Sequence, residues 1–188
     1  MAYFSIRPSL ISYLVLVFLL FAATSSASKV VDVNVICNQA QDPSLCSSIL
    51  NSKPGGTKGA DLISLAQYTI DVARVKANDT INLINMLIAN SDSDSKGKNH
   101  YKACLTNFNK DEGALKDIDY VQELLKNEDY FGISAAARAI NIDIDDCITG
   151  YDTKDTPYDD KSKLPQHADI VEKVVDIILI ISTYLIQN

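Results

Sequence analysis

Hydrophobic positions recur at helical spacing along most of the chain. Between Leu62 and Ile88, apolar or small side chains return every three or four residues, and the opposite side carries polar residues such as Asp71 and Asn82. This period places the apolar residues on one face of an α-helix. The stripe contains Leu62, Leu65, Ala66, Thr69, Ala73, Ala77, Ile81, Ile84 and Ile88. The pattern predicts a long amphipathic helix that ends at the polar run 90–97.

Two more stripes follow, and each predicts another helix. The second contains Tyr101, Cys104, Leu105, Phe108, Leu115, Ile118 and Leu125. Gly113 weakens its middle, because glycine is about 1 kcal/mol less favourable than alanine in a helix. The third contains Ile133, Ala136, Ala137, Ile140, Ile144, Cys147, Ile148 and Tyr151.

The C-terminal part of the chain predicts a loop and then a buried helix. Residues 152–163 are polar and include Pro157. Residues 166–185 are apolar on nearly every side and rich in β-branched residues. Such a composition could suggest a strand, but the length is helical, and a helix that is apolar all round is a buried one.

Four helices with short connections favour antiparallel neighbours. We therefore predict an all-α fold, an up-down-up-down four-helix bundle over about 57–188. The preceding segment, about 30–52, is too short to be a domain. It is interpreted as a short helical hairpin that turns at Asp42-Pro43 and is clamped by a disulfide.

The first 27 residues have the order of a signal peptide. Arg7 supplies the positive start, residues 10–23 are uncharged, and Ser25 and Ala27 are small residues suited to the cleavage site. A membrane anchor needs about 20 apolar residues, which is more than this run contains. We expect cleavage after Ala27, export of a single domain over 28–188, and no membrane attachment afterwards.

The chain is acidic. Its formal net charge is −7, and loss of Arg7 with the leader makes it −8. A surface of this charge repels nucleic acid, anionic membranes and polyanions such as pectin, whereas it favours a basic partner.

All four cysteines lie after the predicted leader. An even number in an oxidising compartment argues for two disulfides, and the sequence allows three pairings. The short interval favours Cys37–Cys46, which leaves Cys104 and Cys147 facing inward from two helices. A zinc site is the alternative, because His100 lies one helical turn from Cys104, but no second close pair of ligands follows.

The sequence offers little for catalysis. It has two histidines and lacks a nucleophile elbow, a zinc-protease motif and a phosphate-binding glycine loop. Residues 92–97 imitate a calcium loop, but Lys96 replaces a ligand and Ala103 stands where a bidentate glutamate is needed. We expect no enzymatic activity, no cofactor and no metal.

Exposed residues on two predicted helices are candidates for partner binding. An aromatic side chain beside polar groups on a rigid helix suits an interface. Ordinary surface is an equally good reading for any one of them. The candidates are Tyr120, Glu123 and Leu124 on the second helix, and Arg138, Asn141 and Asp145 on the third.

Asn78-Asp79-Thr80 is the only N-glycosylation sequon in the sequence. Asn78 falls on the polar face of the first long helix, so a glycan there would point to solvent. The alternative is a sequon that stays unused inside a regular helix.

Several short motifs resemble one plant protein family, the invertase and pectin methylesterase inhibitors. The order and spacing of the four cysteines with their neighbours carry the resemblance, which extends over the exported chain. The motifs are Cys37 with 42–46 (DPSLC), Asp61-Leu62, 101–104 (YKAC), 128–130 (EDY), 134–136 (SAA), Cys147, 164–169 (LPQHAD) and 176–182 (DIILIIS). The last two are closest to the pectin methylesterase inhibitors.

The resemblance implies a four-helix bundle with an N-terminal hairpin and disulfides paired first to second and third to fourth. It also implies a protein of the apoplast or cell wall that covers the active-site cleft of pectin methylesterase in a one-to-one complex. An inhibitor of acid invertase is the closest alternative, and a non-inhibitory ligand-binding or cell-wall module is a remote one. Cys147 is followed by Ile148-Thr149-Gly150-Tyr151, where many members have an acidic pair and a phenylalanine.

Overall fold

The computed structural model describes residues 31–150 and 158–187. The predicted leader, Tyr151 and the first part of the predicted loop lie outside these residues. The described chain is helical and contains no strand. Its helices are α2 (Val33–Cys37), α3 (Pro43–Asn51), α4 (Leu62–Ala89), α5 (Ser95–Phe108), α6 (Ala114–Lys126), α7 (Tyr130–Thr149) and α8 (Leu164–Gln187).

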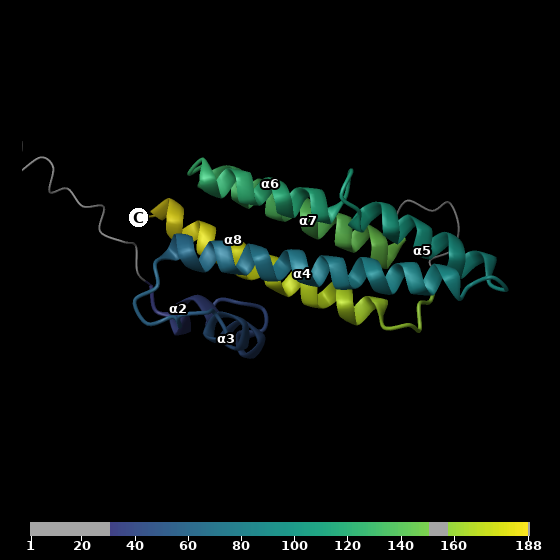
Figure 1. Cartoon of the computed structure of the whole chain (residues 1–188), viewed down its shortest axis with the longest axis horizontal. Helices are drawn as coiled ribbons and strands as arrows, with labels where there is room; N and C mark the ends of the chain where they lie inside the picture. The colour runs from purple at the N-terminus through teal and green to yellow at the C-terminus, as the bar shows by residue number, and fades with distance from the viewer. Residues whose placement is uncertain (1–30, 151–157, 188) are drawn as a thin grey trace, which may run out of the picture.

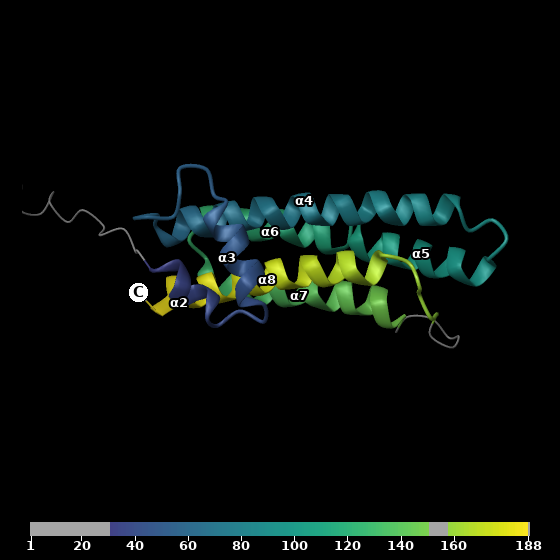
Figure 2. The ribbon, with the colours of Figure 1, turned by 90° about the horizontal axis from the view of Figure 1, so that it is seen from below.

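The four-helix bundle predicted from the sequence is confirmed. Helix α4 runs along the bundle, α5 and α6 return together, α7 runs parallel to α4, and α8 returns (Figure 1). Helices α4 and α7 each pack against α8 and against α5 and α6, so α4 and α7 lie diagonally across the bundle. Figure 2 shows the same elongated arrangement from a perpendicular direction.

The second predicted helix is in fact two helices, α5 and α6. The Asn109 side chain accepts hydrogen bonds from the backbone N–H groups of Asp111 (2.7 Å) and Glu112 (2.9 Å), which turns the chain after α5. The backbone of Gly113 then packs directly on that of Asn107, because a Cβ at Gly113 would lie 2.3 Å from the Asn107 carbonyl oxygen. Glycine is required here by close packing, and the helix breaks beside it.

Aspartates begin most of the helices. Each accepts a hydrogen bond from a backbone N–H of the first turn, which satisfies one of the donors that a helix start leaves unpaired. Asp94 does so for α5, with its Oδ1 atom 3.0 Å from the nitrogen of Gly97. The segment that resembles a calcium loop is therefore the capped start of α5. The other capping residues are Asp32, Asp42, Asp61 and Asp129.

Helix α8 supplies much of the core. Val171, Val174 and Val175 are fully buried, and Ile178 and Ile181 are at most 1% exposed. Its β-branched residues lower helix propensity slightly, but packing against α4 and α7 on two sides outweighs that preference. The prediction of a buried helix is confirmed.

The N-terminal hairpin is also present. The Cys37–Cys46 disulfide joins α2 to α3, and the pair packs against α4 and α8 (Figure 1). The Asp176 carboxylate on α8 accepts a hydrogen bond from the backbone nitrogen of Gln41 at 3.0 Å. This contact ties the turn between α2 and α3 to the bundle.

The second disulfide, Cys104–Cys147, joins α5 to α7. Both cysteines are at most 1% exposed, so the bridge lies inside the bundle. The disulfide pairing expected from the sequence is the one found. Within the described residues, no helix is long and apolar enough to cross a membrane.

We expect loss of the Cys104–Cys147 bridge to lower the free energy of unfolding by about 2–5 kcal/mol. The bridge closes a 43-residue separation, so it restricts the unfolded chain more than the 9-residue Cys37–Cys46 bridge does. Urea denaturation of C104A/C147A, with C37A/C46A for comparison, measures the difference. Equal stability of C104A/C147A and the unmodified chain would contradict this expectation.

Candidate functional site

Three large apolar side chains are exposed on α6 and α7. Tyr120 on α6 is 51% exposed, and Phe131 and Ile142 on α7 are 75% and 61% exposed. Phe131 and Ile142 are the most exposed large apolar side chains of the described residues. Apolar groups held at the surface of a rigid pair of helices are suited to contact a protein partner.

The outward direction of Phe131 and Ile142 follows from the helical period of α7. The exposed residues repeat at intervals of four and three along the helix, opposite to the core stripe. They are Phe131, Ala135, Arg138, Ile142, Asp145 and Thr149. Of this row, only Arg138 and Asp145 were predicted from the sequence as contact residues. The signal for Phe131 and Ile142 in the sequence is that both are large apolar residues out of phase with the core stripe.

Tyr120 lies on the outer surface of α6, where it lines a surface hollow with Asp117 and Glu123. It is three residues after Asp117 and four before Leu124, so the three residues share one side of the helix. Leu124 is packed against the first turn of α7, and Asp117 interacts electrostatically with Asp143 of α7. Tyr120 therefore lies along the outer seam between α6 and α7.

Carboxylates line the same seam. Asp117 of α6 lies near Asp143 of α7, and Asp146 follows on the same side of α7. Burial, together with the neighbouring charges of Asp117 and Asp146, raises the pKa of Asp143 to about 6. Burial also raises the pKa of Asp117, although Lys116 opposes this effect. We call Tyr120, Phe131 and Ile142, with Asp117, Asp143 and Asp146, the α6/α7 side.

The prediction that Leu124 is exposed is wrong. Its side chain is only 6% exposed, because the chain turns back after α6 and the start of α7 covers it. Gly132 makes this close approach possible, since a Cβ at that position would lie 2.8 Å from Cδ2 of Leu124. Leu124 belongs to the core and is not available to a partner.

Asn141 is half-buried and does not project freely. It is seven residues after Ser134, whose hydroxyl is hydrogen-bonded to that of Ser182 on α8 at 3.0 Å, so both face α8. The Oδ1 atom of Asn141 is buried and has no hydrogen-bond partner among the described residues. The prediction of an exposed contact residue is therefore not supported at this position.

The remaining predicted residues are exposed: Glu123 lines the same surface hollow as Tyr120, and Arg138 and Asp145 share the outer row of α7 with Phe131 and Ile142. Glu123 is four residues after Asp119, which is bonded to Arg74 of α4, so it leans toward α4. Arg138 and Asp145 lie on the outer row of α7, and Asp145 is one turn beyond Asn141 on the edge near α8. Of the six predicted residues, only Tyr120 belongs to the α6/α7 side.

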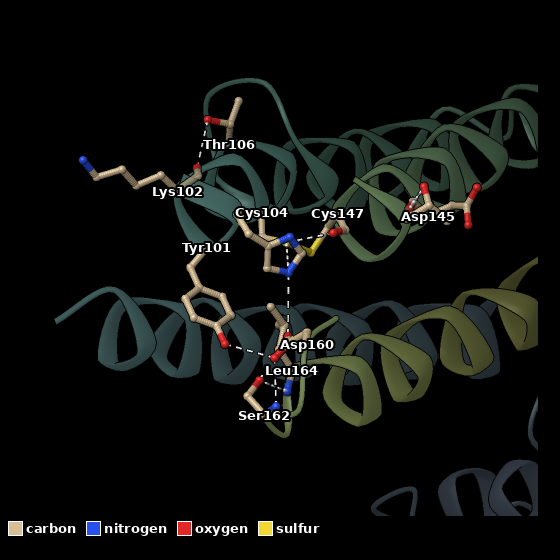
Figure 3. Close-up of a disulfide and its surroundings, with 11 residues drawn as sticks. Tyr101, Lys102, Cys104, Thr106, Asp145, Cys147, Asp160, Ser162 and Leu164 are labelled. Carbon is tan, nitrogen blue, oxygen red and sulfur yellow. Dashed lines mark hydrogen bonds and ion pairs between the residues drawn. A yellow bond between two sulfur atoms is a disulfide. The ribbon is translucent and has the colours of Figure 1, made fainter. Parts of the chain in front are cut away.

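A separate polar cluster lies beside the buried disulfide (Figure 3). The Tyr101 hydroxyl donates to Asp160 at 3.0 Å, and Nε2 of His100 is 3.7 Å from the other oxygen of that carboxylate. Burial lowers the pKa of His100, and the charge of Asp160 opposes this shift. The cluster attaches the segment before α8 to α5. Because Cys104 is bonded to Cys147, its sulfur is not a thiolate, and the zinc alternative loses a ligand.

Comparison with known proteins identifies the family. The family model described as "Plant invertase/pectin methylesterase inhibitor" matches residues 31–181. The chain belongs to this family. Its members are described as enzyme inhibitors, so the expectation that the chain is not an enzyme is confirmed.

Two curated relatives carry related names. A "Pectinesterase inhibitor" from Actinidia deliciosa is 30% identical over 189 residues, covering 98% of each chain. "Pectinesterase inhibitor 2" from Arabidopsis thaliana is 30% identical over 106 residues, covering 53% of this chain and 61% of its own.

Two solved structures share the fold of this family member. One is a mutant form of a pectin methylesterase inhibitor from Arabidopsis, with a TM-score of 0.64 and 23% identity over 80% of this chain and 95% of its own. The other, a pectin methylesterase inhibitor from Arabidopsis thaliana, has a TM-score of 0.56 and 24% identity over 80% and 93%.

We expect Asp143→Asn to stabilise the chain near neutral pH but not in acid. The folded pKa of about 6 exceeds the ordinary value of 3.8, so ionisation of Asp143 costs stability as pH rises from about 4 to about 6. The gain should be about 1 kcal/mol at pH 7.5, after allowance for solvent screening, and near zero at pH 4.

Urea unfolding at both pH values measures this difference. Asp145→Asn is the matched control, because it removes the same charge from an exposed position on the same helix. An equal effect of the two substitutions at pH 7.5 would mean that Asp143 is not held in a special environment.

Proposed function

We propose that this chain is a secreted inhibitor of pectin methylesterase that binds the enzyme one to one and covers its active-site cleft. The observation that carries the proposal is the similarity to the Actinidia deliciosa pectinesterase inhibitor over 98% of both chains. The family model supports it, since it spans both disulfides and four complete helices of the bundle, α4 to α7.

The α6/α7 side is the surface that we assign to the enzyme. Tyr120, Phe131 and Ile142 are already exposed and are held by a bundle with a buried disulfide, so little conformational freedom is lost on binding. Aromatic side chains that become buried at the centre of an interface often contribute 2 kcal/mol or more. These three residues supply the apolar centre of a contact, and the seam carboxylates supply its polar part.

The charge of the chain supports a basic target. An excess of negative charge speeds association with a positively charged surface, and salt screens this attraction. At the acidic pH of a cell wall, Asp143 is protonated for much of the time, because its pKa is about 6. A neutral carboxyl is easier to bury than a carboxylate, so acid favours the complex.

Export is part of the proposal. The first 27 residues have the composition of a signal peptide, and the disulfides Cys37–Cys46 and Cys104–Cys147 suit an oxidising compartment. These features are consistent with a protein that acts in the apoplast.

Acid invertase is the second candidate target, because the family description names both enzymes. A module that carries an apolar ligand has less support. Large side chains such as Phe108 and Ile140 fill the centre of the bundle and have no exposed surface. The hollow beside the disulfide has a volume of about 240 Å³, opens to the surface and is lined partly by the polar residues Asn107 and Asp146.

The first experiment distinguishes the two targets. We expect the purified chain, residues 28–188, to inhibit a plant pectin methylesterase at micromolar or lower concentration and at a limiting ratio of one to one. The same preparation should leave a cell-wall invertase active. Inhibition of the invertase alone would assign the chain to the second target, and inhibition of neither enzyme would contradict the proposal.

The second experiment tests the α6/α7 side. We expect Tyr120→Ala and Ile142→Ala each to weaken inhibition by roughly 10-fold or more, because each removes an apolar group from the contact. Met86→Ala, which truncates an exposed apolar side chain on α4, serves as the matched control and should have little effect. Circular dichroism verifies that the variants are folded. If Tyr120→Ala and Ile142→Ala inhibit as well as the unmodified chain, or if Met86→Ala weakens inhibition as much as they do, another surface makes the contact.

A further inference from the structure

The inhibitor function leaves the sequon on α4 unexplained. Asn78 is exposed, on the outer surface of α4, and Thr80 is fully buried. The two side chains therefore project to different sides of the helix. Both are also engaged with the backbone: the Asn78 amide donates to the Arg74 carbonyl at 2.8 Å, and the Thr80 hydroxyl donates to the Lys76 carbonyl at 2.9 Å.

We propose that Asn78 carries an N-linked glycan that is attached before α4 folds. A transferase that reads asparagine and threonine together cannot reach both in the folded helix, because residues two apart do not face the same way. The unfolded chain has no such restriction when it enters the secretory pathway. The proposal rests on that export, and it does not require inhibitory activity.

The transfer uses a lipid-linked oligosaccharide diphosphate as the donor. The Nδ2 atom of Asn78 forms a bond to C1 of the first sugar, and the bond from C1 to the diphosphate oxygen breaks. The lipid diphosphate leaves, and one amide proton passes to a base of the transferase. One N–H remains on Nδ2, so the modified side chain can still donate to the Arg74 carbonyl when α4 forms.

The folded chain accommodates a glycan at this position. Val75, three residues before Asn78, is 57% exposed and lies on the neighbouring turn. A sugar attached to Asn78 covers this apolar side chain and increases solubility. Helices α4 and α7 lie diagonally across the bundle, so the glycan leaves from a corner away from Phe131 and Ile142. It therefore leaves most of the α6/α7 side accessible.

Intact mass measurement tests the attachment. The full chain is expressed in a yeast secretory host, recovered from both medium and microsomes, and treated with a peptide N-glycosidase, which leaves aspartate at the released position. We expect the wild type to lose glycan mass and peptide mapping to find the new aspartate at residue 78. Wild-type chain with only its peptide mass in both fractions would overturn the proposal.

Variants on α4 identify the cause of the mass. Asn78→Gln should carry no glycan, whereas Thr80→Ser, which keeps the sequon, should still carry one. Asn82→Gln is the matched control, because it changes an exposed asparagine one turn further along α4 and leaves the sequon intact. Glycan on Asn78→Gln, or its loss from Asn82→Gln, would contradict the assignment to Asn78.

Two further measurements test timing and placement. In microsomes supplied with the lipid-linked donor, the reduced, unfolded chain should accept the glycan at least about tenfold faster than the folded, disulfide-bonded chain. Equal rates would contradict attachment before folding. Inhibition of pectin methylesterase should be the same, within about twofold, before and after enzymatic release of the glycan. A gain of inhibition on release would show that the glycan covers the contact surface, although the mass result would still stand.

Discussion

Burial of α8 is the interaction on which the rest of the structure depends. This helix packs against α4, α7 and the N-terminal hairpin, and its valines and isoleucines fill the centre of the bundle. Each such side chain contributes roughly 1.5–3 kcal/mol when it leaves water. Because α8 follows the other helices of the described residues, the bundle closes only when α8 returns to α4. The inner faces of the bundle helices α4 to α8 are thereby committed to the core, and function is left to their outer surfaces.

The Cys104–Cys147 bridge and the polar cluster beside it secure one end of this arrangement. The bridge joins α5 to α7, and Asp160, just before α8, accepts a hydrogen bond from Tyr101 on α5. These links keep the segment before α8 close to the disulfide (Figure 3). A bundle held in this way presents the outer surface of α6 and α7 with little loss of conformational freedom on binding, which is an advantage for an inhibitor that acts by covering a cleft.

The sequence predicted most of the helices because helical periodicity is local, and it predicted the disulfides because Cys37 and Cys46 are close in sequence, which leaves Cys104 for Cys147. It did not predict the break between α5 and α6. Phe108 and Leu115 are seven residues apart, which is close to two helical turns, so the apolar stripe continues in phase across the break. Leu124 was misplaced for another reason: the periodicity of α6 alone does not reveal that α7 returns over it at Gly132. Only Tyr120 was recognised on the α6/α7 side, although Phe131 and Ile142 stand out of phase with the core stripe that the sequence already assigns to this helix.

The central claim is that the α6/α7 side contacts pectin methylesterase. Hydroxyl-radical footprinting of the free chain and of its complex with the enzyme tests this claim most directly, because it reports side-chain exposure residue by residue. We expect Tyr120, Phe131 and Ile142 to become protected from labelling in the complex. Met86, 58% exposed on α4, serves as an internal reference and should keep its reactivity. Protection of Met86 with unchanged labelling of the three α6/α7 residues would contradict the assignment of the α6/α7 side to the enzyme.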